Sequence, residues 1–251
     1  RGDFQAALGF LDRSLSMNAW NTRAMNLKAT VLRKLGRGQE GLKLLDGVAA
    51  FDPLDVRSLA ERYLAGKGRQ TADALRAEFA AHPAAGLETA VEYSNAGLFD
   101  DAKKLLEQIP PSPLTYYLRG WYAGKLGEES LRSASYGAAS QAPRDSAFPF
   151  QMEMIAVLRD AMKANPRDAR APYYLGNLLF DHQPEEAVKL WEAARALDPS
   201  FPIVHRNLAL AYQRQADGLG RAVAAMEQTV ALNPGDPMFL FELDKMYEAS
   251  G

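Results

Sequence analysis

Three groups of residues in this sequence have types that could support chemistry: a glycine motif, three histidines and several adjacent carboxylates. Gly36, Gly38 and Gly41 have the Gly-x-Gly-x-x-Gly spacing that holds a pyrophosphate in dinucleotide-binding folds. That use requires a strand immediately before the first glycine, and no strand pattern precedes this one. We therefore interpret the glycines as a turn between two helices, where they end one helix and let the next one pack closely.

The histidines and the carboxylates do not form a catalytic or metal-binding pattern. His82, His182 and His205 are far apart in sequence, and none belongs to a His-Glu-x-x-His arrangement. Adjacent acids such as Glu185 and Glu186 stand at the start of a predicted helix, where the helix dipole favours negative charge. No Gly-x-Ser-x-Gly nucleophile motif is present. We expect no enzymatic activity, no cofactor and no metal site.

Composition excludes further classes of function. The 251 residues are 47% hydrophobic and 24% charged, as in ordered globular proteins, and the net charge of -2 does not favour nucleic acid. No apolar run approaches the roughly 20 residues that span a bilayer, so no membrane association is expected. The sequence has 0 cysteines, which fits a reducing compartment and leads us to expect a cytoplasmic protein.

The elements that would position any functional side chain are set by an internal repeat. Short polar motifs that end in proline recur at Pro53, Pro166, Pro199 and Pro234, and the last three are 33 and 35 residues apart. Within each unit, apolar residues recur every three or four positions, the spacing of amphipathic helices. A break such as Pro184 divides a unit into two helices. The sequence thus predicts tandem helical hairpins of about 34 residues.

Small and large residues alternate in register where the two helices of a unit would pack. The clearest unit has Gly176 and Leu179 in its first helix, and Ala187, Trp191 and Ala194 in its second. This pattern resembles the tetratricopeptide repeat family. The resemblance implies an all-α solenoid of helical hairpins, an α-α superhelix, that serves as a protein-binding scaffold.

Three stretches depart from the regular repeat. Spacing falls to 30 residues between Pro53 and Pro83 and to 27 between Pro83 and Pro110, which predicts short second helices. Only 23 residues separate Pro143 from Pro166, so we expect an irregular unit near 144–166 with one helix over about 151–163. Residues 1–251 should form one array with a soft break near 144–152. Because no methionine opens it, we expect a piece of a longer protein.

Residues 171–177 and 201–208 carry a second, narrower resemblance. They look like the C-terminal repeat tail of large bacterial proteins with a β-rich, sugar-enzyme-like N-terminal domain. This resemblance implies a bacterial source. It also leaves open an alternative function, a structural or oligomerisation appendage of a larger, carbohydrate-active protein.

A ligand groove can be read from the repeat register. In a helical solenoid the first helices line the concave face, and residues one turn from the packing positions point into it. Aromatic, amide and arginine side chains at these positions suit an extended peptide or an acidic tail. The predicted groove residues are Tyr117, Trp121, Arg170, Tyr173, Tyr174, Asn177, Arg206, Asn207, Gln213 and Arg214.

The expected partner is a protein or peptide of unknown identity, or another domain of the same parent protein. One subclass of the family grips acidic chaperone tails with amides and basic residues. Asn177 and Asn207 match its two amide positions, but Tyr173 replaces a lysine, and Met238 and Glu242 stand where basic residues are needed. These departures disfavour a chaperone-tail clamp.

Overall fold

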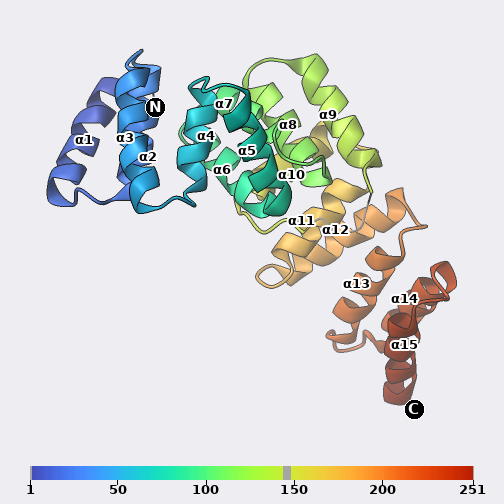
Figure 1. Cartoon of the computed structure of the whole chain (residues 1–251). Helices are drawn as coiled ribbons and strands as arrows, with labels where there is room; N and C mark the ends of the chain where they lie inside the picture. Colours follow the sequence, from blue (N-terminus) through green and yellow to red (C-terminus); the bar gives the residue numbers. More distant parts are fainter. Residues whose placement is uncertain (1, 144–147, 251) are drawn as a thin grey trace. The chain divides into compact units, whose positions relative to one another are not determined.

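The computed structural model of the protein describes residues 2–143 and 148–250, and over these residues it is entirely helical. They form the fifteen α-helices of Figure 1 and no strand. The predicted all-α class, built of helical hairpins, is therefore confirmed. Among the described helices, none is long and apolar enough to cross a membrane.

The chain divides into two compact units, which we describe separately. One comprises Arg1–Pro111 with Lys125–Gly127, and the other Ser112–Gly124 with Glu128–Gly251. The helices of the first unit are α1 (Phe4–Met17), α2 (Thr22–Lys34), α3 (Gly38–Phe51), α4 (Val56–Leu64), α5 (Arg69–Ala81), α6 (Pro83–Asn95) and α7 (Phe99–Leu106). The helices of the second are α8 (Pro113–Lys125), α9 (Glu129–Gln141), α10 (Glu153–Ala164), α11 (Arg170–Leu179), α12 (Pro184–Leu197), α13 (Pro202–Gln213), α14 (Leu219–Leu232) and α15 (Pro237–Ser250).

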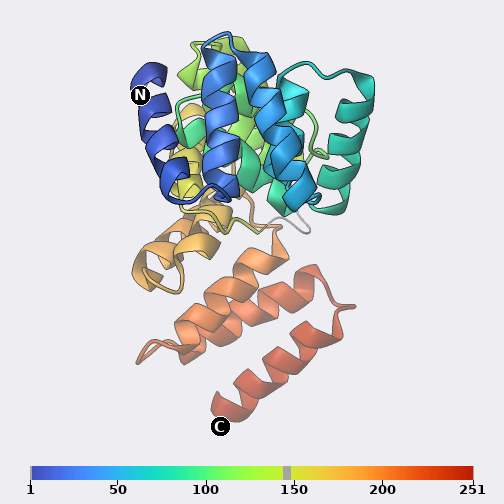
Figure 2. The ribbon, with the colours of Figure 1, turned by 60° about the vertical axis from the view of Figure 1, so that its left-hand side comes forward.

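Within each unit, helices that follow one another in sequence pack together as hairpins. The most extensively packed pairs in the first unit are α2 with α3 and α6 with α7, and in the second unit α11 with α12 and α13 with α14. Figure 2 shows α13, α14 and α15 side by side. Each hairpin buries one apolar stripe per helix against its neighbours, as the three-to-four-residue spacing requires.

Local sequence signals begin and end these helices. Asn21 caps α2 by accepting a hydrogen bond from the Ala24 N–H at 3.0 Å, and a proline opens α6, α12 and α13. The predicted turn at the glycine motif is confirmed. Gly36 lies in the turn after α2 with a φ of 77°, and Gly41 lies so close to the backbone of Ala29 that a Cβ would stand 3.0 Å from its carbonyl oxygen.

One prediction about helix length is wrong. The second helix of the unit between Pro53 and Pro83, α5, has 13 residues, and the short helix of that unit is the first one, α4, with 9. α4 ends early because Gly66 and Gly68 both adopt positive φ, at 76° and 86°, before α5 begins. In the next unit the second helix, α7, is short as predicted, with 8 residues.

The helix expected over about 151–163 is confirmed as α10, while residues 144–147 of the predicted irregular unit and soft break lie outside the described residues.

A buried charged network ties four helices of the first unit together. The Glu61 side chain on α4 is 2% exposed and accepts hydrogen bonds from Thr30 at 3.0 Å, Arg33 at 2.5 Å and Tyr93 at 2.5 Å. Arg33 also contacts Asp101 on α7 at 3.0 Å. Burial alone would raise the pKa of Asp101, but hydrogen bonds from Arg33 and its neighbouring lysine hold that pKa below its ordinary value. The network therefore stabilises the packing of α2, α4, α6 and α7.

Replacing Glu61 by alanine should destabilise the first unit by about 3 kcal/mol, because it leaves the buried Tyr93 phenol without its acceptor and removes one of the two carboxylate partners of Arg33. The control Glu40→Ala breaks the exposed pair with Arg37 and should change stability far less. Urea unfolding followed by circular dichroism compares the two variants. Equal effects would contradict the structural role given to Glu61.

Candidate functional site

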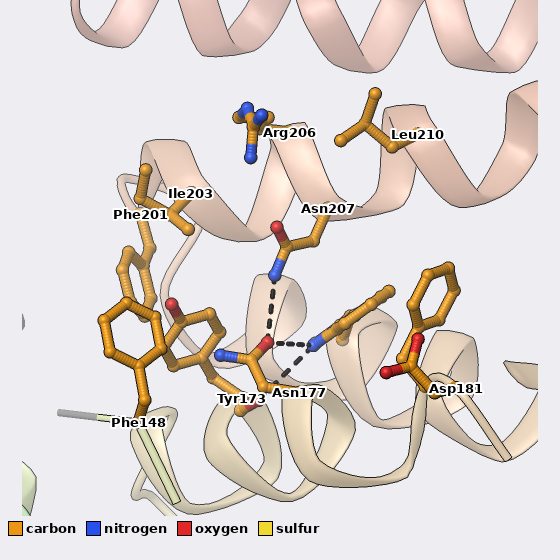
Figure 3. A pocket seen from close by; sticks show the side chains of 11 residues that line it. Phe148, Tyr173, Asn177, Asp181, Phe201, Ile203, Arg206, Asn207 and Leu210 are labelled. Carbon is orange, nitrogen blue, oxygen red and sulfur yellow. Dashed lines mark hydrogen bonds between the residues drawn. The ribbon is translucent and has the colours of Figure 1, made fainter. Parts of the chain in front are cut away.

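The second unit contains a hollow of about 560 Å³ between α11, α12 and α13. Figure 3 shows the side chains that surround it, and most of them are aromatic, aliphatic or amide groups. Four predicted groove residues, Tyr173, Asn177, Arg206 and Asn207, line this hollow together. The remaining lining residues are Phe148, Phe180, Asp181, Trp191, Phe201, Ile203 and Leu210.

A close helix contact places the indole of Trp191 in the wall of the hollow. A Cβ on Gly176 would lie 2.5 Å from the Trp191 Nε1 and 2.6 Å from its Cδ1, so only glycine leaves room for the ring. The indole N–H of Trp191 donates to the side-chain oxygen of Asn177 at 3.0 Å and to the backbone oxygen of Tyr173 at 3.3 Å. Glycine on α11 thus lets a tryptophan on α12 reach the polar edge of α11.

This tryptophan fixes the orientation of both asparagine side chains. An indole N–H can only donate, so the Asn177 atom facing it must be the carbonyl oxygen Oδ1. The same oxygen accepts a second hydrogen bond at 3.0 Å, so the Asn207 atom facing it must be the amide nitrogen Nδ2. Figure 3 shows both bonds as dashed lines. Among the described residues, the Asn177 Nδ2 and the Asn207 Oδ1 have no hydrogen-bond partner.

Aromatic rings form most of the apolar wall. The Tyr173 and Phe201 ring centres are 4.7 Å apart, and those of Phe180 and Trp191 are 4.9 Å apart. Phe148, which precedes α10, is 70% exposed and stands at the side of the hollow in Figure 3. Such pairs form a rigid apolar surface, because aromatic side chains have few rotatable bonds to immobilise.

The charges at the hollow are largely neutralised from within the protein. Arg206 forms a two-point ion pair with Glu242 of α15, with its Nε 2.7 Å from one carboxylate oxygen and an Nη 2.5 Å from the other. This pair raises the pKa of Arg206 above its ordinary value. The other charged lining residue is Asp181, which is exposed. A bound ligand therefore meets a surface without strong positive charge.

Two of the predicted groove residues are not accessible. Tyr117 and Tyr174 are each 0% exposed, so they pack in the core. Tyr117 donates to Asp168 at 2.7 Å, and burial together with the Asp168 charge raises the Tyr117 pKa well above its ordinary value. Asp168 in turn accepts the N–H of Arg170 at 2.8 Å and so caps the start of α11.

The other four predicted groove residues lie outside the wall of the hollow. Trp121 and Arg170 are half-buried, and the guanidinium of Arg170 donates to the backbone oxygen of Ala139 at 3.3 Å. Gln213 and Arg214 are exposed at the end of α13.

Some of the missed lining residues could have been found from the sequence. Ile203 and Leu210 stand 33 residues after Arg170 and Asn177, which is the spacing between Pro166 and Pro199, so the repeat register assigns them to the same face. Phe148 could not be found in this way, since it lies in a segment without a repeat pattern.

Histidines and carboxylates are not gathered into a metal site in the part of the chain that the structure describes. His205 is buried, and its ring nitrogen lies 2.8 Å from the backbone oxygen of Pro199.

Stacked two-helix hairpins with glycine-mediated contacts define a helical-repeat protein. The family model described as tetratricopeptide repeat matches residues 178–237, from α11 to the first residue of α15. The repeat family that the sequence resembles is therefore matched within residues 178–237. Repeats of this family generally serve as scaffolds for protein–protein interaction. No curated protein matches the chain.

Several solved structures are similar over much of their length. A tetratricopeptide-repeat protein with an unusual peptide-binding site, YrrB, is 14% identical, with 94% of this chain and 97% of that chain covered and a TM-score of 0.35. MamA from Desulfovibrio magneticus RS-1 is 21% identical over 65% and 82%, with a TM-score of 0.38. A thermophilic tetratricopeptide-repeat protein from Thermus thermophilus is 17% identical over 90% and 98%, with a TM-score of 0.36. At this level of similarity, no property of these proteins transfers to the chain.

The close contact at Gly176 predicts that an alanine there lowers the stability of the second unit, whereas an alanine at a control glycine raises it. Gly176→Ala should destabilise the second unit by about 1–3 kcal/mol, because the added methyl group displaces the Trp191 ring. Gly137→Ala, on a helix position with nothing within 4 Å, should stabilise it by about 0.5–1 kcal/mol. Thermal unfolding of both variants measures the difference, and a Gly176→Ala variant as stable as the parent would refute the contact.

Proposed function

We propose that the chain is a scaffold whose second unit binds an extended peptide segment of a partner protein in the hollow between α11, α12 and α13. The segment contacts Asn177 and Asn207 through its backbone and places an apolar side chain among the surrounding aromatic rings. The family supports the general role, and the geometry of the two asparagines supports this particular mode.

The two asparagines carry the proposal. The Asn177 oxygen accepts hydrogen bonds from the Trp191 indole and from the Asn207 amide nitrogen. This arrangement leaves the N–H donor of Asn177 and the carbonyl acceptor of Asn207 for a ligand. A peptide bond offers the complementary acceptor and donor. Because the network fixes both amides in advance, binding a backbone there costs little side-chain entropy.

The apolar wall favours a bulky apolar side chain on the bound segment. Tyr173, Phe180, Phe201, Ile203 and Leu210 surround the hollow, and its volume of about 560 Å³ is in the range of pockets that take small ligands or anchor residues. Anchors of this kind supply most of the affinity in many interfaces.

The ion pair of Arg206 argues against the acidic tail that the sequence also allowed. Glu242 already occupies the guanidinium in a two-point contact, and Asp181 adds a negative charge nearby. An acidic ligand would have to displace Glu242 and leave a carboxylate that is 16% exposed without its partner. We therefore favour a neutral, apolar segment.

The proposal is tested with Asn177→Asp. An aspartate keeps an oxygen for Trp191 and Asn207 but replaces the N–H donor by an acceptor, so the fold should persist while a peptide carbonyl is repelled. Peptides selected from a displayed random library on the whole chain should bind the variant at least about tenfold more weakly by fluorescence polarisation.

Asn233→Asp is the matched control, because it adds the same charge at an exposed position outside the hollow, and it should bind like the parent. The proposed peptide binding in this hollow would be contradicted if no peptide were selected, or if Asn177→Asp and Asn233→Asp bound the peptides equally well. The alternative function, a structural or oligomerisation appendage, would in turn be excluded if a longer parent protein assembled unchanged after deletion of this region.

A further inference from the structure

Helix α13 contributes to a second hollow on the side opposite to the proposed peptide groove. His205 and Tyr212 are seven residues apart, about two helical turns, so they lie on one line along α13. Asn207 and Leu210, which line the first hollow, lie on roughly the other side of the same helix. The second hollow has a volume of about 350 Å³ between α12, α13 and α14.

Two arginines from different helices line this second hollow. Arg195 of α12 is half-buried, and among the described residues it forms no ion pair or hydrogen bond. Arg221 of α14 is exposed, donates to the Gln215 side chain at 2.6 Å, and lies with its guanidinium carbon 4.5 Å from the centre of the Tyr212 ring. Both positive charges are thus available to a ligand.

Both arginines line the hollow together with Tyr212. Burial and the hydrogen bond to Glu192 raise the Tyr212 pKa, while the charges of Arg195 and Arg221 both act to lower it. Arg221 lies over the Tyr212 ring, and Arg195 of α12 lines the same hollow. The Tyr212 hydroxyl donates to Glu192 at 2.7 Å, which holds the single carboxylate of the hollow at its wall.

The remaining polar groups complete an environment that suits an anion. The His205 ring nitrogen donates to the backbone oxygen of Pro199, since a carbonyl can only accept, and this bond fixes the ring in the wall. Gln228 of α14 adds an amide that can donate. With two arginines against one glutamate, the charged lining residues sum to +1, in contrast to the neutralised first hollow.

We propose that this hollow, lined by Arg195, Tyr212 and Arg221, is a binding site for a phosphate monoester. Two guanidiniums that approach from separate helices match a phosphate group, which offers three acceptor oxygens and close to two negative charges. A single carboxylate is satisfied by one guanidinium and would leave the second unused. The volume of about 350 Å³ leaves room for the organic part of an ester beside the Tyr212 ring.

The test is calorimetric titration of the whole chain with phenyl phosphate, inorganic phosphate and benzoate at low ionic strength. Phenyl phosphate should bind saturably and more tightly than either other probe. The double variant Arg195→Gln/Arg221→Gln should bind it at least about tenfold more weakly, because each lost charged hydrogen bond contributes substantially to affinity. The control Arg159→Gln/Arg167→Gln removes the same charge from exposed positions and should bind like the parent.

A second variant should change affinity in the opposite direction. Glu192→Gln removes the only acid of the hollow yet keeps an oxygen for the Tyr212 hydroxyl, so phenyl phosphate should bind severalfold more tightly. Absence of saturable binding, equal losses in the two double variants, or weaker binding by Glu192→Gln would each overturn the site. Equal affinity for inorganic phosphate would overturn its assignment to an ester. None of these outcomes bears on peptide binding in the first hollow, since the two sites share no lining residue.

Discussion

The close approach of two helices within a hairpin is the constraint on which this structure depends. At Gly176 the missing side chain is replaced by the Trp191 ring, and at Gly120 by the Tyr136 ring, whose nearest atom would stand 2.4 Å from a Cβ. At Gly41 the backbone of the facing helix takes that space. In each contact a glycine on one helix leaves room for a ring or for the backbone of the other helix, which fixes the separation and the register of the two helices.

That packing contact also creates the polar geometry of the candidate peptide site. Because the Trp191 ring can reach across α11, its N–H meets the Asn177 oxygen, and this contact in turn orients Asn207. A smaller residue at 191 would remove the donor that selects this orientation of the Asn177 and Asn207 pair. The recognition surface is therefore a consequence of core packing, which explains how repeats with one architecture acquire different ligand surfaces through a few exposed positions.

The repeat register places Tyr173, Asn177, Arg206 and Asn207 on one face, because a fixed period puts equivalent residues on the same side, and the structure brings these four side chains to one hollow. The register did not separate them from Tyr174, which is adjacent in sequence to a lining residue yet 0% exposed. Periodicity gives the direction of a side chain on its own helix, but whether another helix covers it depends on packing between repeats. The length of α4 escaped prediction for a related reason, since proline spacing measures a whole unit and not the position of its inner turn.

The sequence did not predict which arginines would be paired with acids in the folded protein. The net charge of -2 gives no hint that the two sides of α13 differ, and Arg206 and Arg195 are indistinguishable as residue types. Their environments differ because Glu242 of α15 lies within reach of Arg206, whereas no acid of the described residues pairs with Arg195. An arginine that is paired inside the protein contributes little attraction for an anion, while an unpaired one retains it. The pairing partner therefore determines which side of α13 favours a neutral segment and which favours a phosphate.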